Sequence, residues 1–378
     1  MKGGLTLRQL HRWCGMLLGA FIVLAAATGA VLCFQSELDD WLNADVVRLG
    51  SVHAPLAPSQ LMAAIEAHYP SARVARLPLD TAPGHAWRVV LAPRGDDELV
   101  MDEAWIDPAS GRALGERLWG APRLDRRHFI PFLHRLHYSL ALGAPGILFM
   151  GVIGLAWLAM TCAGLRLAWP RAGQWRQLFC FRRDAQNGRL PFSLHRAAGL
   201  ITAPVFLLIA LTAVCFNLDF MFRPLIAALS APAAAPATAA LSTLYEGTSP
   251  EQAIELATAF FADARPARLD PDPAHRVYRI HLRRSRDAGI RPEAIVTVDM
   301  RAPRILKVAA PENRAVDAFN AWRFPLHTGQ FLGWEGRILW SACGLLPLVL
   351  MATGLRLWLT RRTSRAAAMR RHPRREPA

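Results

Sequence analysis

Four long apolar stretches interrupt an otherwise mixed pattern of hydrophobic and polar positions along the 378-residue chain. Each stretch lacks Asp, Glu, Lys, Arg and His, and a helix that crosses a bilayer needs about 20 mostly apolar residues. Three stretches reach this length, and tryptophans near the ends of the shorter fourth suit the membrane interface. The pattern therefore predicts four transmembrane helices, within residues 13–34, 138–165, 197–218 and 338–355.

The first apolar stretch also has small residues that resemble a signal-peptide cleavage region. The apolar core of a signal peptide has roughly 7–15 residues, however, and residues 13–34 form a longer run. We therefore interpret this stretch as a helix that stays in the mature protein.

Charge is distributed very unevenly between these stretches. Residues 1–12, 166–196 and 356–378 carry +3, +6 and +7, whereas the whole chain carries +15, so the remainder is nearly neutral. This is the positive-inside pattern of an inner-membrane protein with both termini in the cytoplasm. The two long connections would then face the periplasm, and the basicity gives no reason to expect nucleic-acid binding.

An internal repeat organises the chain. Leu-His-Arg at residues 10–12 recurs at 194–196, and Leu-His at 136–137 recurs at 326–327. Gly-Leu-Arg-Leu at 164–167 likewise recurs at 354–357, and Thr28 recurs as Thr212. Two parallel halves of this kind predict a pseudo-two-fold axis along the membrane normal.

Each long connection predicts a small α+β domain. A short amphipathic helix (58–69 and 250–261) is followed by probable strands (87–91, 100–106, 277–282 and 294–298), and the Ala/Pro run 230–240 resembles a linker. The fold class is thus a mainly α membrane protein with two parallel repeats. Its expected segments are an N-terminus with the first helix (1–35), an external domain (36–136), a second helix (137–169), a basic loop (170–194), a third helix (195–220), a second external domain (221–326), a fourth helix (327–360) and a basic tail (361–378).

Four of the twelve histidines occupy repeated positions at helix ends. His11 and His195 should lie at one depth of the membrane, and His137 and His327 at another. Two imidazoles on facing helices can bind one haem iron from opposite sides. Because the chain has no CxxCH motif, the expected cofactors are two non-covalent b-type haems. A single histidine at a helix end is more often an interfacial side chain, and duplication alone copies residues, so this reading remains open.

Other polar side chains compete for roles in such sites. His134 would share a helix face with His137, and it or His128 could replace a ligand or contact a haem propionate or the substrate. The residue that corresponds to His134 in the second half is Phe324, which favours His137 as the ligand. Arginines next to the histidines could bind haem propionates or serve as interfacial charges; these are Arg12, Arg196 and Arg135.

Several of these motifs together resemble the PepSY-associated transmembrane family. They are Leu-His-Arg-Trp-Cys-Gly at 10–15, Leu-His-Tyr-Ser-Leu-Ala-Leu-Gly at 136–143 and Leu-His-Thr-Gly-Gln-Phe-Leu-Gly at 326–333. Trp-Ile-Asp-Pro-Ala-Ser-Gly-Arg at 105–112 resembles the external PepSY signature, and 297–304 resembles a degenerate second copy. The resemblance covers nearly the whole chain except the tail.

Within that family, the length and the absence of a fused flavin domain are most similar to the inner-membrane ferric-siderophore reductases. This resemblance implies two haems, bound by the histidine pairs just described, and reduction of a periplasmic Fe(III)–siderophore by an electron donor that the sequence leaves open. In this mechanism the substrate is expected between the external domains, above His137 and His327. Trp322, Arg323 and Trp334 could line that mouth, although interfacial anchoring is the more common role for each Trp.

Two other functions fit the same pattern. The external domains could recognise a peptide or protease while the helices only anchor them, or the protein could be a siderophore or iron permease without redox activity. Ion and proton transporters normally carry ionisable groups inside the membrane, and the four apolar stretches have none. No Walker motif, GxGxxG loop or HExxH motif is present.

Overall fold

The computed structural model describes residues 6–96, 98–170, 172–178, 189–228, 247–261, 263–284 and 293–371. The expected linker at 230–240, much of the basic loop and the last seven residues of the tail lie outside these ranges.

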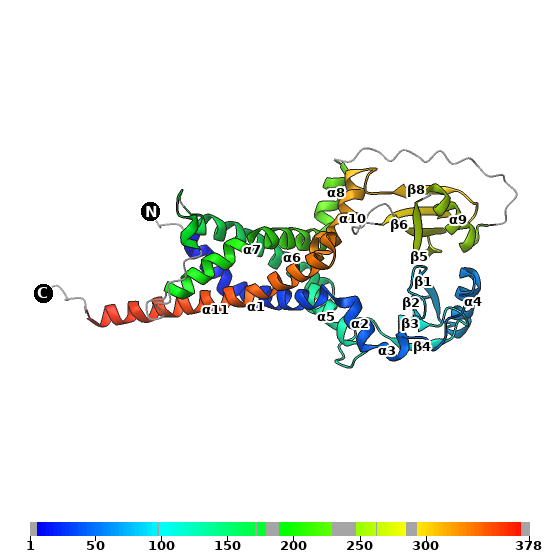
Figure 1. Ribbon diagram of the computed structural model, residues 1–378, viewed down its shortest axis with the longest axis horizontal. Coiled ribbons are helices and arrows are strands. Elements are labelled where there is room, and N and C mark those ends of the chain that lie inside the picture. Colours follow the sequence, from blue (N-terminus) through cyan, green and yellow to red (C-terminus); the bar gives the residue numbers. More distant parts are fainter. Residues whose placement is uncertain are drawn as a thin grey trace.

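Four long helices form an elongated bundle, with both termini near one end (Figure 1). All four apolar stretches form helices that are long and apolar enough to cross a membrane. A capping box between Thr6 and Gln9 starts the first helix. The four are α1 (Leu7–Leu32), α6 (Ala144–Ala168), α7 (Arg189–Asn217) and α11 (Gly333–Arg371).

Each helix of the bundle packs against two neighbours. α6 packs on α7, α7 on α11, α11 on α1 and α1 on α6. α1 and α7 therefore lie diagonally across the bundle. A buried cluster at the centre takes side chains from all four helices, among them Ile22, Trp157, Phe206 and Cys343.

The other end of the molecule is a sheet domain. Its eight antiparallel strands have the order β4-β3-β2-β1-β5-β6-β7-β8, so four strands come from each long connection. The strands are β1 (Ala72–Pro78), β2 (Trp87–Pro93), β3 (Glu103–Ile106), β4 (Ala113–Arg117), β5 (Ala264–Asp272), β6 (Val277–Arg284), β7 (Ala294–Asp299) and β8 (Ile305–Ala309).

The two halves of the sheet share one core rather than forming two separate domains. β1 pairs with β5 through Leu77 and Leu269, which removes one exposed edge from each half. The two amphipathic helices, α4 (Pro58–His68) and α9 (Pro250–Phe260), cover the same face of the sheet. Figure 1 shows both helices on the side away from the bundle.

Short helices connect the bundle to the sheet domain. They are α2 (Gln35–Leu42), α3 (Ala44–Val47), α5 (Phe129–Ser139), α8 (Asp219–Ala228) and α10 (Ala315–Thr328), and two 3₁₀ turns occur at Trp175–Leu178 and Gln330–Leu332. The predicted segments 137–169 and 327–360 therefore each contain two helices. His137 lies on α5 and His327 on α10, outside the long helices.

Glycines of the repeated motif cause this break between helices. Gly143 and Gly333 adopt φ values of 66° and 69°, which favour glycine. Three residues later the chain folds back so closely that a Cβ atom on Gly146 would lie 1.8 Å from the carbonyl oxygen of Ser139. A Cβ atom on Gly336 would likewise lie 2.1 Å from the carbonyl oxygen of Gly329.

Replacing Gly146 with valine should therefore destabilise the protein by about 3 kcal/mol or more, because the new side chain forces α5 away from α6. Thermal unfolding of the purified protein in detergent measures this effect. Gly50 has open space around it, so Gly50→Val is the matched control. Equal melting temperatures for the two variants would contradict the close packing described at Gly146.

Candidate functional site

Two of the four repeated histidines form a pair at the end of the bundle where the termini lie, here called the tail-side pair. His11 on α1 and His195 on α7 face each other across the bundle with ring centroids 6.3 Å apart. The Nδ1 atom of His11 lies 3.2 Å from the carbonyl oxygen of Met160 on α6. The Nδ1 atom of His195 lies 3.1 Å from the carbonyl oxygen of Leu350 on α11.

The other two histidines form the sheet-side pair. His137 on α5 and His327 on α10 have ring centroids 6.2 Å apart. Their Nδ1 atoms lie 2.9 Å from the hydroxyl oxygens of Thr28 on α1 and Thr212 on α7, respectively. The structure thus brings together both histidine pairs that the repeat predicts.

The hydrogen bonds assign the same tautomer to all four rings. The Thr28 hydroxyl donates to the carbonyl oxygen of Leu24 at 2.7 Å, so it accepts from the ring of His137. The Thr212 hydroxyl likewise donates to the carbonyl oxygen of Leu208 and accepts from the ring of His327. In the tail-side pair the partners of Nδ1 are backbone carbonyl oxygens, which can only accept a hydrogen bond. Each Nδ1 therefore carries the hydrogen, and each Nε2 has a free lone pair for a ligand or a metal.

Glycines leave room for three of the imidazole rings. A Cβ atom on Gly29 would lie 2.9 Å from Cε1 of His137. Similar atoms on Gly164 and Gly354 would lie 3.2 and 3.4 Å from Cε1 of His11 and His195. The repeated Gly-Leu-Arg-Leu motif thus has a steric role, since its glycine lets each helix approach the ring on the neighbouring helix.

The described part of the chain contains no group of three or more His, Cys, Asp or Glu side chains arranged to hold a metal ion. Each histidine pair therefore offers two ligands, and a metal bound there would need its other ligands from elsewhere. Burial lowers the pKa of His137 to about 3 and that of His327 to about 4. Both rings are neutral at physiological pH, and neutral imidazole is the form that binds metals.

Comparison with known protein families fits this arrangement. The model of the PepSY-associated TM region matches residues 8–361, which include both histidine pairs. The chain belongs to the PepSY-associated transmembrane family. It is also 28% identical over 267 residues to an uncharacterised protein of Pseudomonas aeruginosa, a match that covers 62% of this chain and 64% of that protein.

Other histidines of this PepSY-associated protein do not join the pairs. His134 lies near the sheet-side pair, where its ring contacts Trp119 and Tyr138 at centroid distances of 5.6 and 5.8 Å. Burial lowers its pKa. His128 is bound to the carboxylate of Asp125, with its Nδ1 atom 2.8 Å from Oδ1. His134 therefore lies close to the sheet-side pair without joining it, whereas His128 is held by Asp125.

The arginines beside the histidines have different surroundings. Arg196 donates from Nε to the carbonyl oxygen of Ala168 at 2.9 Å, at the free C-terminus of α6. The corresponding carbonyl for Arg12 lies within the continuous helix α11, and Nε of Arg12 is buried with no hydrogen-bond partner in the described part of the chain. Arg135 reaches the carbonyl oxygen of Gly120 at 3.3 Å. Of these three arginines, Arg12 is thus the one with an unused buried donor.

The three residues expected at a substrate mouth contact different parts of the protein. Arg323 forms an ion pair with Asp219 at 2.6 Å and lies over the ring of Phe216. Trp334 is 55% exposed and stacks on Phe34 with ring centroids 5.7 Å apart. Trp322 is half-buried on α10, one residue before Arg323.

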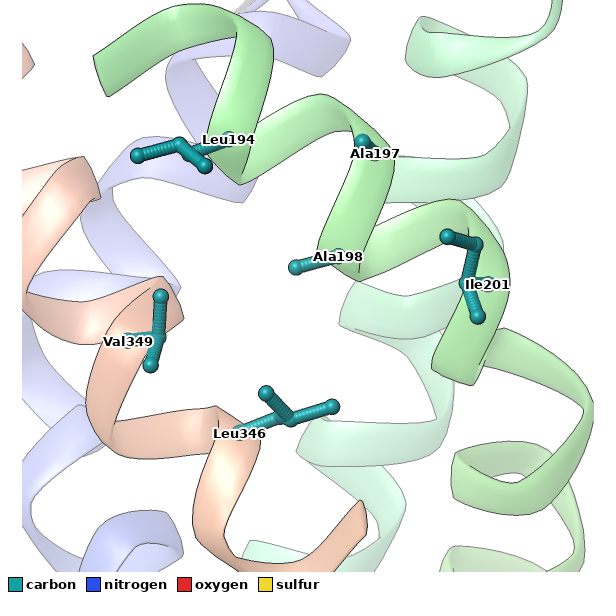
Figure 2. A pocket seen from close by; sticks show the side chains of 6 residues that line it. All are labelled: Leu194, Ala197, Ala198, Ile201, Leu346 and Val349. Atoms are coloured by element: carbon teal, nitrogen blue, oxygen red, sulfur yellow. The ribbon is translucent and has the colours of Figure 1, made fainter. Parts of the chain in front are cut away.

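An apolar hollow of about 280 Å³ lies between α7 and α11, next to the tail-side pair. Figure 2 shows Ala198, Leu346 and Val349 around this space. The lining has no polar surface and consists of Leu194, Ala197, Ala198, Ile201, Leu346 and Val349. Leu194 directly precedes His195 in the chain, and Val349 directly precedes Leu350, whose carbonyl oxygen is the partner of His195.

The sequence interpretation missed the partners that orient the rings. Thr28 and Thr212 share the 184-residue offset of His11 and His195, so the repeat contained the signal. Their distance in sequence from His137 and His327 hid their role. Only the packing of α5 on α1 and of α10 on α7 brings each threonine to its histidine.

Proposed function

We propose that this protein is a di-haem electron-transfer protein of the bacterial inner membrane that reduces Fe(III)–siderophore in the periplasm and releases Fe(II). The observation that carries the proposal is the presence of two histidine pairs at opposite ends of the bundle, each with both Nδ1 atoms hydrogen-bonded. In this proposal the termini are cytoplasmic, the sheet domain is periplasmic, and a pseudo-two-fold axis relates the two halves.

The spacing within each pair suits axial ligation of one iron atom. Two imidazoles that bind a metal from opposite sides, with metal–nitrogen bonds of about 2 Å, have ring centroids roughly 6 Å apart. The observed centroid distances are 6.3 Å for the tail-side pair and 6.2 Å for the sheet-side pair. A porphyrin would supply the other ligands of the iron, which suits sites where the described residues offer two histidines each.

The surroundings of the tail-side pair also suit haem. The hollow beside His195 offers an apolar lining for an apolar macrocycle. The buried Nε of Arg12 has no partner among the residues that the structure describes and would donate to a haem propionate. Arg196 uses its own Nε for Ala168, so Arg12 is the stronger candidate for this role.

Haem iron, when bound, supplies reversible one-electron transfer. The residues of this chain hold all four rings in one tautomer and keep the sheet-side rings neutral. From His11 to Thr28, the partner of His137, α1 rises about 25 Å, so the two pairs span most of a bilayer core. Siderophore oxygen atoms are hard ligands that prefer Fe(III) to Fe(II), and reduction therefore loosens the complex.

A visible absorption spectrum of the purified protein tests the proposal. We expect a red protein with a Soret band, a sharp α band after reduction with dithionite, and two non-covalent haems per chain. The reduced protein should then be reoxidised by Fe(III)–siderophore. A folded but colourless preparation would refute haem binding, and a haem protein that Fe(III)–siderophore fails to reoxidise would refute the substrate.

Replacing His134 with phenylalanine, the residue found at the corresponding position 324, should leave both haems bound. The ring of His134 contacts aromatic side chains rather than a second histidine. The haem-to-protein ratio and the reduced α band measure this outcome. Loss of one haem in this variant would instead make His134 a ligand in place of His137.

A further inference from the structure

The face of the sheet opposite α4 and α9, here called the inner face, differs between the two halves of the sheet domain. It is turned towards the bundle (Figure 1). In the first half α3 covers this face, since Val46 and Val47 pack against Trp105. Beside them Arg117 is buried between the carboxylates of Asp39 and Glu103.

The inner face of the second half carries exposed cations instead. Along β6, Ile280 and Leu282 are buried in the core, so the alternating residues Arg279, His281 and Arg283 lie on the inner face. Strand pairing extends this row to both sides. The cations of this face are Arg265, Arg268, Arg279, Arg283 and Lys307, and Arg76 adjoins them on β1, the strand of the first half that pairs with β5. These six residues are here called the arginine face.

Two of these arginines lie directly opposite each other. Arg265 on β5 pairs with Arg283 on β6 in the strand register, and both residues are exposed. Like charges at such positions destabilise a sheet. Asp80 already pairs with Arg283 at 2.6 Å, and a bound anion would balance the charge that Arg265 adds beside it.

The carboxylates of this face lie below the guanidinium groups. The side chain of Arg279 is 41% exposed and that of its partner Asp272 is 17% exposed. Arg76 and Asp270 differ in the same direction, with 50% and 17%, and Arg283 and Glu293 with 56% and 28%. Asp80, which pairs with Arg283, is more exposed at 42%. Away from Asp80, a solute that approaches the arginine face therefore meets guanidinium groups first.

Hydrogen bonds keep the carboxylates beneath the guanidinium groups charged and in place. His281 lies between two carboxylates, 3.2 Å from Asp270 and 3.3 Å from Glu293. The hydrogen bond with His281 lowers the pKa of Glu293, and although burial acts in the opposite direction, His281 and Arg268 lower that of Asp270. These carboxylates position the arginines, and each guanidinium has five donors, more than one carboxylate occupies.

We propose that the arginine face binds an anionic Fe(III) chelate, with carboxylate or catecholate ligands, and so selects the substrate class of this protein. The reduction of that chelate rests on the proposed function, whereas its binding does not. Charge complementarity carries the proposal, because planar guanidinium groups bind such oxygen pairs bidentately. Residues 229–246 of this chain contain one charged residue, Glu246, and lack the anionic character that this surface requires.

Binding of redox-inert Ga(III) chelates to the full-length protein in detergent tests the proposal. Isothermal titration should show that a Ga(III) tris-catecholate binds, that a neutral Ga(III) trihydroxamate binds more weakly, and that added salt weakens the first. The double substitution Arg279→Gln/Arg283→Gln should weaken tris-catecholate binding by about tenfold or more. The double lysine variant, which keeps the charge, should retain part of the affinity.

Arg112 is exposed on the β3–β4 turn beside α4, away from the inner face, so Arg112→Gln should bind like the unmodified protein. Equal affinity for the neutral and anionic chelates, or unchanged affinity in the double glutamine variant, would overturn the proposal. Ga(III) is not reduced, so weakened binding in that variant supports the arginine face even if the protein fails to reduce Fe(III). Conversely, if the protein reduces Fe(III)–siderophore but the double glutamine variant binds the Ga(III) chelate with unchanged affinity, the proposed function stands and this inference is wrong.

Discussion

Replacing His137 with alanine should reduce the haem content of the purified protein from two per chain to one. The variant leaves His327 without a partner across the sheet-side pair, while the tail-side pair lies about 25 Å away along α1. Haem extracted into pyridine and measured against protein concentration gives the ratio. The remaining haem should keep the spectrum of a site with two histidine ligands.

The matched control for this experiment is His128→Ala. His128 lies on the same segment of chain, and its ring is bound to Asp125 rather than to another histidine. This control should retain both haems. If His137→Ala lost both haems or neither, the two pairs would not be independent axial sites, and the pairing proposed for them would be wrong.

Replacing Arg117 with methionine should destabilise the sheet domain by about 3–5 kcal/mol. The side chain of Arg117 is 2% exposed and forms ion pairs with Asp39 at 2.8 Å and with Glu103 at 2.7 Å. Methionine has a similar volume, so the main effect is to leave two buried carboxylates without their shared partner. Denaturant unfolding of the purified protein measures the loss.

Arg126→Met provides the comparison, because Arg126 is paired with Asp45 at the surface of the same region and is 55% exposed. Exposed ion pairs contribute about 1 kcal/mol or less, so this variant should stay close to the unmodified protein. A similar small loss in Arg117→Met would mean that the carboxylates find other partners, such as Arg88 for Asp39.

The relation between sequence and fold differs between the bundle and the sheet domain. Spans of about 20 apolar residues can cross a bilayer only as helices, because the backbone must satisfy its own hydrogen bonds there. Hydropathy alone therefore located α1, α6, α7 and α11. In the sheet domain four of the eight strands were predicted, β2, β3, β6 and β7, whereas β1, β4, β5 and β8 were not. The joining of β1 to β5 was not predicted either, since strand order depends on contacts between residues nearly two hundred positions apart.

The candidate site shows the same division. The repeated positions of His11, His195, His137 and His327 predicted two pairs, and the structure brings these residues together. The helices that carry His137 and His327 were assigned to the long spans, whereas they are separate. The difference arises because α5 and α10 end at Leu140 and Gly329, both with positive φ values, and the long helices begin only at Gly143 and Gly333.

By itself the sequence determined the number of long apolar helices, their charge asymmetry and the identity of the paired histidines. These properties depend on local composition and on an internal repeat, and both can be read along the chain. Only the tertiary structure decided that Thr28 and Thr212 orient the sheet-side rings and that the two halves share one sheet. It also decided that α3 covers the inner face in the first half of the sheet, whereas arginines line this face in the second half. Helix packing and strand pairing bring together residues that no local sequence pattern connects.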